Sequence, residues 1–86
     1  MTIQYSNPSI QDYKAIPDPI RKKFKRKLSL LASHGITYPG LNAQKMVNEH
    51  NIWEARIDIH YRFTFEMDND IIVVRRIGTH EIYRKP

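Results

Sequence analysis

Apolar and polar residues alternate along the second half of the chain, as they do in strands that expose one face. Residues 53–58 alternate between apolar and charged side chains, and residues 61–66 repeat the alternation. Residues 71–77 begin with four apolar residues in a row, a pattern typical of a strand covered on both faces. The link 67–70 is short, and its Asn and Asp residues tolerate the positive φ that hairpin turns need. These patterns predict three antiparallel strands.

The first two of these strands are predicted to share a charged face, opposite their apolar face. Its side chains are Glu54, Arg56, Arg62 and Thr64. Arg75 and Arg76 are neighbours in the third strand, so we expect them to point to opposite faces of the sheet. Alternation alone does not say which of the two arginines joins the charged face.

The N-terminal part predicts a short strand followed by a short helix. Residues 3–6 alternate apolar and polar side chains, and Asn7-Pro8 ends this strand. Ser9 is predicted to cap a helix that extends from Ile10 to about Ala15.

A second, longer helix is predicted to begin at Pro17-Asp18-Pro19 and to extend to about His34. Asp18 can accept hydrogen bonds from the free amides, and Pro19 is preorganised for the first helical position. Gly35 provides the C-terminal stop. Four apolar residues, three or four positions apart, form one stripe along the helix: Ile20, Phe24, Leu28 and Leu31.

The same helix carries six cations within the seven positions from Arg21 to Lys27. Such a row is usually a solvated face, but it is also suited to binding nucleic acid, and the sequence leaves both interpretations open. If the row binds RNA, Lys23 and Arg26 are its candidate RNA-binding residues.

Residues 35–51 show little periodicity and are predicted to form a loop. Residues 38–40 and 48–51 have the composition of turns, and a helical turn is predicted around residues 43–47. Lys45 lies in this loop, where a lone lysine is usually solvated.

Together, these elements predict an α+β fold. An N-terminal strand and two helices precede a three-stranded antiparallel meander, and the helices pack on the apolar face of the sheet. With 86 residues, the chain is expected to form a single domain, 1–86.

Composition narrows the possible classes of function. The chain has no cysteine, which excludes disulfide frameworks, zinc ribbons and thiol nucleophiles. Fourteen Lys and Arg against nine Asp and Glu give a net charge of +5, which favours a polyanionic partner. The sequence has neither a run of about 18 apolar residues nor a secretory leader, so we expect a cytoplasmic protein without a membrane partner.

The segment 78–86 holds the residues best suited to catalysis. His80 can take and give a proton near neutral pH, and Tyr83 offers a hydroxyl group and a stacking face. Arg76 and Arg84 lie on either side of this pair and could hold a phosphate. A single histidine is more often structural than catalytic, so the segment alone does not identify a site.

The order and spacing of these elements resemble the RelE/ParE superfamily of bacterial toxin–antitoxin toxins. Three stretches carry the resemblance: Ile52-Trp53-Glu54-Ala55-Arg56-Ile57, Tyr61-Arg62-Phe63-Thr64-Phe65 and Arg75-Arg76-Ile77-Gly78-Thr79-His80. The resemblance spans nearly the whole chain, and the Gly-Thr-His ending is similar to the branch that contains YafQ. It implies a RelE-like sheet and a toxin that cleaves mRNA on the translating ribosome and so inhibits translation. It also implies a cognate antitoxin as partner.

The resemblance also implies roles for three candidate catalytic residues, and the predicted strand face shared with Glu54 adds a fourth. Arg62 matches an arginine of the family that would hold the scissile phosphate, and its charged fork suits that role. His80 would act as general acid or base, and Tyr83 would stack on a base or help to transfer a proton. Arg56 is the next candidate for a phosphate contact.

RNA brings its own nucleophile, the 2′-hydroxyl group, so cleavage needs a base, an acid and cations. No metal or other cofactor is therefore expected. Glu54 could be the base or could pair with Arg56, and the sequence leaves both open. The candidate RNA-binding residues are Lys45, Arg76, Arg84, Lys23 and Arg26.

Two alternative functions remain open at this stage. The RelE toxin has paired lysines where this chain has Glu54 and Arg56, so the general base is unassigned. ParE-type relatives inhibit DNA gyrase without a catalytic histidine, which makes a non-enzymatic gyrase inhibitor the second hypothesis. A non-catalytic module that binds RNA or the ribosome is the third.

Overall fold

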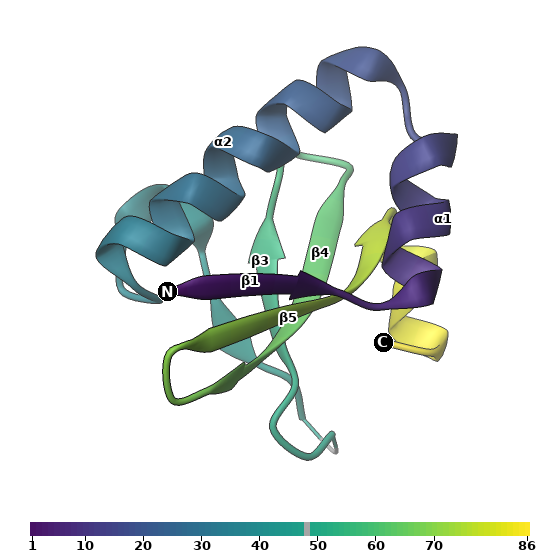
Figure 1. The fold of residues 1–86 in the computed structure, drawn as a ribbon. Helices are drawn as coiled ribbons and strands as arrows, with labels where there is room; N and C mark the ends of the chain where they lie inside the picture. Colours follow the sequence, from purple (N-terminus) through teal and green to yellow (C-terminus); the bar gives the residue numbers. More distant parts are fainter. Residues whose placement is uncertain (48) are drawn as a thin grey trace.

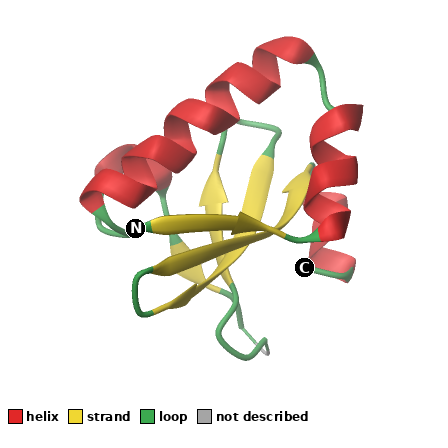
Figure 2. Ribbon diagram, in the orientation of Figure 1, coloured by secondary structure: helices red, strands yellow, loops and turns green. Residues whose placement is uncertain are grey.

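The computed structural model describes residues 1–47 and 49–86, which form a five-stranded mixed sheet and two α-helices (Figures 1 and 2). The strands lie in the order β1-β5-β4-β3-β2. Their bounds are β1 Thr2–Tyr5, β2 Gln44–Lys45, β3 Trp53–Arg56, β4 Arg62–Asp68 and β5 Ile71–Gly78. The structure confirms the predicted α+β class.

Strands β3, β4 and β5 form the predicted antiparallel meander. Asn69 has a φ of 54° in the β4–β5 turn, as the composition of that link predicted. Strand β1 pairs with β5 in parallel and forms one edge of the sheet. The sequence predicted this strand but not its place beside β5, because pairing between distant segments leaves no local pattern.

Helix α1, Asn7–Ala15, begins earlier than predicted. The capping residue is Ser6 rather than Ser9, because the Ser6 side chain accepts a hydrogen bond from the Ser9 amide at 3.2 Å. Pro8 fits within the first turn, where a missing N–H costs nothing. Ser9 is fully buried, and its hydroxyl donates to the Ser6 main-chain oxygen.

Helix α2, Asp18–His34, ends where the sequence predicted, but its start differs. Pro17 occupies the cap position, and no side chain caps the helix. The Asp18 carboxylate pairs with Arg21 at 2.9 Å instead of accepting from free amides. Gly35 follows the helix with a φ of 82°, a conformation that favours glycine. No helix among the described residues is long and apolar enough to cross a membrane.

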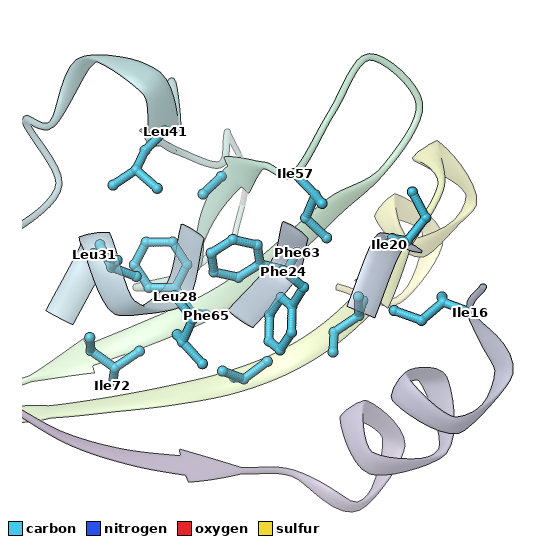
Figure 3. Packing of buried hydrophobic residues seen from close by; sticks show 13 residues of the cluster. Ile16, Ile20, Phe24, Leu28, Leu31, Leu41, Ile57, Phe63, Phe65 and Ile72 are labelled. Carbon is cyan, nitrogen blue, oxygen red and sulfur yellow. The ribbon is translucent and has the colours of Figure 1, made fainter. Parts of the chain in front are cut away.

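The apolar stripe of α2 packs against the sheet and forms the core with it (Figure 3). All four predicted stripe residues are buried. Phe24 meets Phe63 of β4 edge to face, with 5.2 Å between the ring centroids. Trp53 and Tyr61 lie at the margin of this core and are only partly buried. One face of the sheet is thereby covered, and the opposite face is left for the C-terminal segment.

The loop before β3 contains two short elements that the sequence did not predict. Residues Pro39–Leu41 form the 3-10 turn η1, and β2 pairs antiparallel with β3. The helical turn predicted around residues 43–47 is therefore wrong. Pairing with β3 gives the β2 backbone hydrogen-bond partners that a single isolated helical turn would lack. Of the turn predicted at 48–51, Asn48 lies outside the described residues.

A β-bulge changes the directions of Arg75 and Arg76. Thr64 faces Arg76, but Phe65 faces Val74, so Arg75 is the extra residue on β5. Both arginines turn toward the C-terminal segment, so the prediction that they point to opposite faces is wrong. Strict alternation fails here because the extra residue shifts the register by one position.

Candidate functional site

The C-terminal segment folds back over the face of the sheet opposite the core. It begins with the 3-10 helix η2, His80–Arg84, whose Ile82 is buried. A Cβ atom on Gly78 would lie 2.8 Å from the Ile82 side chain, so only glycine permits this close approach. The main-chain oxygen of Pro86 accepts hydrogen bonds from the Thr64 hydroxyl at 2.8 Å and from Arg75 Nε at 3.1 Å. The segment is thus anchored at both ends.

Residues of this segment and of the sheet line a concave site of about 370 Å³. The lining residues are Asn42, Gln44, Glu54, Arg56, Arg62, His80 and Tyr83. The four residues predicted to be catalytic therefore lie together, although they come from β3, β4 and η2. Glu54, the possible base, lies among them.

Arg56 and Arg62 are direct neighbours across the β3–β4 pair. Like charges that face each other across two strands are destabilising. Neither guanidinium group belongs to an ion pair among the described residues. Arg56 is exposed, and Arg62 donates to the main-chain oxygen of Asp58 at 3.1 Å. The pair therefore forms a positive site whose charge an anion would compensate.

The turn between β3 and β4 positions Arg62. The Asp58 carboxylate accepts hydrogen bonds from the amides of His60 and Tyr61, both at 2.8 Å. Burial of the carboxylate by itself raises the pKa of Asp58. The hydrogen bonds from these amides and the charge of Lys23 outweigh this effect and lower the pKa below its usual value. Asp58 is therefore ionised at neutral pH and holds the turn closed.

Glu54 is held in place by a neighbour that sequence analysis missed. Gln44 of β2 lies opposite Glu54 of β3, and its Nε2 atom donates to Glu54 Oε1 at 2.8 Å. The alternative expectation, an ion pair between Glu54 and Arg56, is absent from the described residues. The carboxylate is thus oriented by an amide rather than by a cation.

Tyr83 is the member of the site whose ionisation is shifted. Burial raises the pKa of its hydroxyl group above the ordinary value of 10.0. The charge of Glu54 and its interaction with the hydroxyl raise the pKa further, whereas Arg62 acts in the opposite direction. The hydroxyl group therefore stays protonated at neutral pH and can donate a hydrogen bond. His80, the first residue of η2, is exposed and accessible from solvent.

Three of the five predicted RNA-binding residues lie in other surroundings. Lys45 pairs with Trp53 and lies on the opposite strand face from Gln44, so it does not line the site. Arg76 forms an ion pair with Asp12 at 2.7 Å. Arg84 is exposed and lines a different depression.

The remaining two, Lys23 and Arg26, are exposed on α2. Lys23 Nζ lies 3.9 Å from an oxygen of Asp58, the outer limit of an ion pair. Helix α2 covers the core face of the sheet, so these two cations and the concave site are on different layers (Figure 1). An RNA contact at these residues would thus form a separate surface.

Asn42 and Gln44 are the lining residues that sequence analysis did not select. They flank the start of a two-residue strand, which is too short to show an alternating pattern. Asn42 has a φ of 47°, a conformation in which Asn is enriched. This preference for a turn is the one local feature of the sequence that could have drawn attention to Asn42.

Several solved toxin structures share this fold. A YoeB dimer from Staphylococcus aureus has a TM-score of 0.81 and 21% identity, covering 93% of this chain and 97% of that chain. A RelB–RelE antitoxin–toxin complex from Methanococcus jannaschii has a TM-score of 0.77 and 25% identity, covering 96% and 99%. YafQ from Escherichia coli strain BL21(DE3) has a TM-score of 0.78 and 15% identity, covering 94% of each chain. The fold is therefore that of the RelE-like toxins.

The family assignment comes from the sequence itself. Residues 3–82 match the family model of the ParE toxin of type II toxin–antitoxin system, parDE. The chain belongs to this family and is a toxin of the RelE/ParE superfamily, as the sequence resemblance indicated. No curated protein sequence matches the chain.

Proposed function

We propose that this toxin is an endoribonuclease that cleaves mRNA on the translating ribosome in the cytoplasm. The observation that supports this function is the gathering of Arg56, Arg62, His80 and Tyr83 beside Glu54 in one concave site. A paired-arginine anion site next to a carboxylate, an imidazole and a protonated phenol has the groups that RNA cleavage requires.

In the proposed reaction, the 2′-hydroxyl group of one nucleotide attacks the adjacent phosphorus atom. The bond from phosphorus to the 5′-oxygen of the next nucleotide breaks, which leaves a 2′,3′-cyclic phosphate. Glu54, which Gln44 orients, would take the 2′-hydroxyl proton. His80 in its protonated form gives a proton to the leaving 5′-oxygen. No metal takes part in this scheme.

The remaining groups of the site stabilise the reacting phosphate. Arg56 and Arg62 would each hold a non-bridging oxygen, since guanidinium groups bind phosphate oxygens with paired hydrogen bonds. Charge that develops on these oxygens in the transition state would strengthen both contacts. Tyr83 would donate a hydrogen bond to the phosphate or stack on a flanking base.

Induced expression with RNA mapping tests this function. The wild-type protein should arrest growth and produce cuts within translated messages. The single variants His80→Ala and Arg62→Ala should each slow cleavage by about 10²–10⁴-fold, the usual range for a lost acid–base or electrostatic group. Lys14→Ala, which removes an exposed cation from α1, outside the cation row of α2, serves as the control and should cleave normally. Unchanged toxicity and cleavage in the double variant His80→Ala/Arg62→Ala would reject the assigned site.

We also propose that an antitoxin protein restrains this toxin. The YoeB and YafQ relatives are found in complexes with the antitoxins YefM and DinJ, respectively. With a net charge of +5, this chain favours an acidic partner. Co-expression of a small acidic protein encoded beside this gene should restore growth. Continued arrest despite expression of that neighbour would argue against the pair.

The family match to ParE supports a second candidate function, inhibition of DNA gyrase without catalysis. It predicts gyrase-linked DNA breaks and intact mRNA, whichever residue replaces His80. The third possibility, a module that binds RNA or the ribosome without catalysis, predicts binding with no cleavage products. Mapping of RNA ends in induced cells separates the endoribonuclease from both.

A further inference from the structure

The C-terminal segment lines a second depression of about 460 Å³. Tyr83 belongs to the site with His80, and the next residue, Arg84, belongs to this second depression. Its charged side chains are four cations and one carboxylate: Arg75, Arg76, Arg84, Lys85 and Glu49. The two depressions are therefore connected through consecutive residues of one chain segment.

Two of the four cations form the inner wall of the second depression. Arg75 pairs with Glu66 at 3.0 Å and donates to the main-chain oxygen of Pro86. Arg76 pairs with Asp12 at 2.7 Å and donates to the main-chain oxygen of Lys85 at 3.2 Å. Both arginines hold the C-terminal segment in place, and acidic partners compensate their charges.

The other two cations are available to a ligand. Arg84 and Lys85 are exposed, and neither side chain forms an ion pair with any described residue. Glu49 is the single acidic side chain among the described lining residues. The rim thus carries an excess of positive charge that faces solvent, where an incoming anion needs little desolvation of its partners.

We propose that this second depression is a subsite for the phosphodiester backbone of single-stranded RNA. Arg84 and Lys85 would each contact a phosphate beyond the one held by Arg56 and Arg62. A strand in the concave site that continues along the C-terminal segment would reach them. This subsite rests on the proposed function in that both bind the same RNA strand.

Equilibrium binding of a non-cleavable RNA tests the subsite. The probe is a fully 2′-O-methylated oligonucleotide, long enough to cover both depressions, and the short probe is a trinucleotide of the same chemistry. Each lost phosphate contact lowers the slope of log affinity against log salt by about 0.7 for single strands. The variant Arg84→Ala/Lys85→Ala should therefore lower the slope by about 1.4 for the long probe and leave the trinucleotide unaffected.

Matched variants make this result specific. Lys14→Ala/Lys22→Ala removes two exposed cations from the helices and should keep the wild-type slope. Arg84→Lys/Lys85→Arg exchanges the cations and should also keep it. Glu49→Gln should strengthen binding of the long probe. An unchanged slope in Arg84→Ala/Lys85→Ala, or an equal fall in the helix control or with the trinucleotide, would overturn the proposal.

The test separates this subsite from the proposed reaction. The 2′-O-methyl probe lacks the nucleophile, so its binding does not depend on catalysis. A lowered slope in a protein that cleaves no RNA would support the subsite and reject the endoribonuclease. Cleavage that depends on His80, together with an unchanged salt slope in Arg84→Ala/Lys85→Ala, would support the endoribonuclease and reject the subsite. Loss of antitoxin binding in Arg84→Ala/Lys85→Ala with unchanged RNA binding would assign the depression to the antitoxin and overturn the subsite.

Discussion

At the scale of single residues, Gly78 sets the distance between the C-terminal segment and the sheet. It ends β5 opposite Arg62, and the Ile82 side chain occupies the space that a Cβ atom would need. Because His80 and Tyr83 follow within five residues, any outward shift of this segment moves both away from Arg62. Packing at one glycine therefore controls the shape of the candidate site.

The variant Gly78→Ala should destabilise the fold by about 1–3 kcal/mol, the usual cost of overpacking a close contact. RNA cleavage should fall as well, because the segment must move outward. Gly40→Ala is a suitable control, since its new Cβ atom would meet its nearest neighbour, Lys27 Nζ, at an ordinary 3.5 Å. Denaturant unfolding and cleavage rates measure the two effects. Equal stability of both variants would show that the close approach to Ile82 is not restrictive.

The raised pKa of Tyr83 predicts how the stability of the fold changes at alkaline pH. Its pKa in the folded protein lies above the ordinary 10.0, chiefly because of burial and Glu54. The stability linked to this group is therefore complete below pH 10.0 and is lost as pH rises through the folded pKa. Tyr83→Phe removes this part of the loss, so its unfolding free energy should fall less than that of the wild type above pH 10.0. Tyr5→Phe, at an exposed position of β1, should behave like the wild type. Parallel losses in all three proteins would contradict the assignment.

At the scale of secondary structure, one carboxylate joins α1, β5 and the C-terminal segment. Asp12 accepts hydrogen bonds from Arg76 Nε at 2.7 Å, Arg76 Nη2 at 3.2 Å and the Ile77 amide at 2.9 Å. Arg76 in turn donates to the main-chain oxygen of Lys85. The side chains of Asp12 and Arg76 are only 18% and 28% exposed, so this network is largely shielded from water. It fixes the segment that carries His80 and Tyr83.

Asp12→Ala should cost about 2 kcal/mol, because it leaves the Arg76 guanidinium and the Ile77 amide without their acceptor. Cleavage should also weaken, since Arg76 no longer holds the C-terminal segment firmly. Asp18→Ala breaks the Asp18–Arg21 pair, whose carboxylate is 70% exposed, and should cost less than about 1 kcal/mol. Denaturant unfolding of both variants checks this order. Similar losses of unfolding free energy in the two variants would mean that shielding from water adds little to the stability that the Asp12 network provides.

At the scale of the whole molecule, the cations lie on two different layers. Lys23 and Arg26 project from α2, which covers the core face, whereas Arg56 and Arg62 lie on the opposite face of the sheet. Neither Lys23 nor Arg26 lines the concave site, so a short RNA strand bound in that site would not need them. A ribosome is large enough to contact both layers, so the helix cations would act in ribosome association rather than in cleavage of a free strand.

The variant Lys23→Ala/Arg26→Ala should therefore bind the ribosome more weakly, and its affinity should depend less on salt concentration. The same variant should bind a short free oligonucleotide with wild-type affinity. Arg84→Ala/Lys85→Ala is the reciprocal variant, because it is expected to affect the free strand. Sedimentation with ribosomes and oligonucleotide titration measure the two properties. An unchanged ribosome affinity would identify the helix row as a solvated face.

The sequence predicted the elements of the fold well, because burial of one face imposes a period on each element. The stripe on α2 and the alternation in β3 and β4 led directly to the observed core. The caps of α1 and α2 were predicted less well. Ser6 and Ser9 are both good caps by type, and only the position of the chain after β1 selected Ser6.

By itself, the sequence determined which faces are apolar, the net positive charge and, through the order of its motifs, the family. It also selected His80, Tyr83, Arg56 and Arg62, and their catalytic roles remain predictions. The tertiary structure alone decided which other residues join them: Gln44 entered the site through a two-residue strand, while the bulge on β5 turned two arginines toward the C-terminal segment. The physical reason is the distance along the sequence over which each interaction acts. Periodicity records local burial, whereas register, bulges and the return of a chain segment depend on packing between residues far apart in sequence.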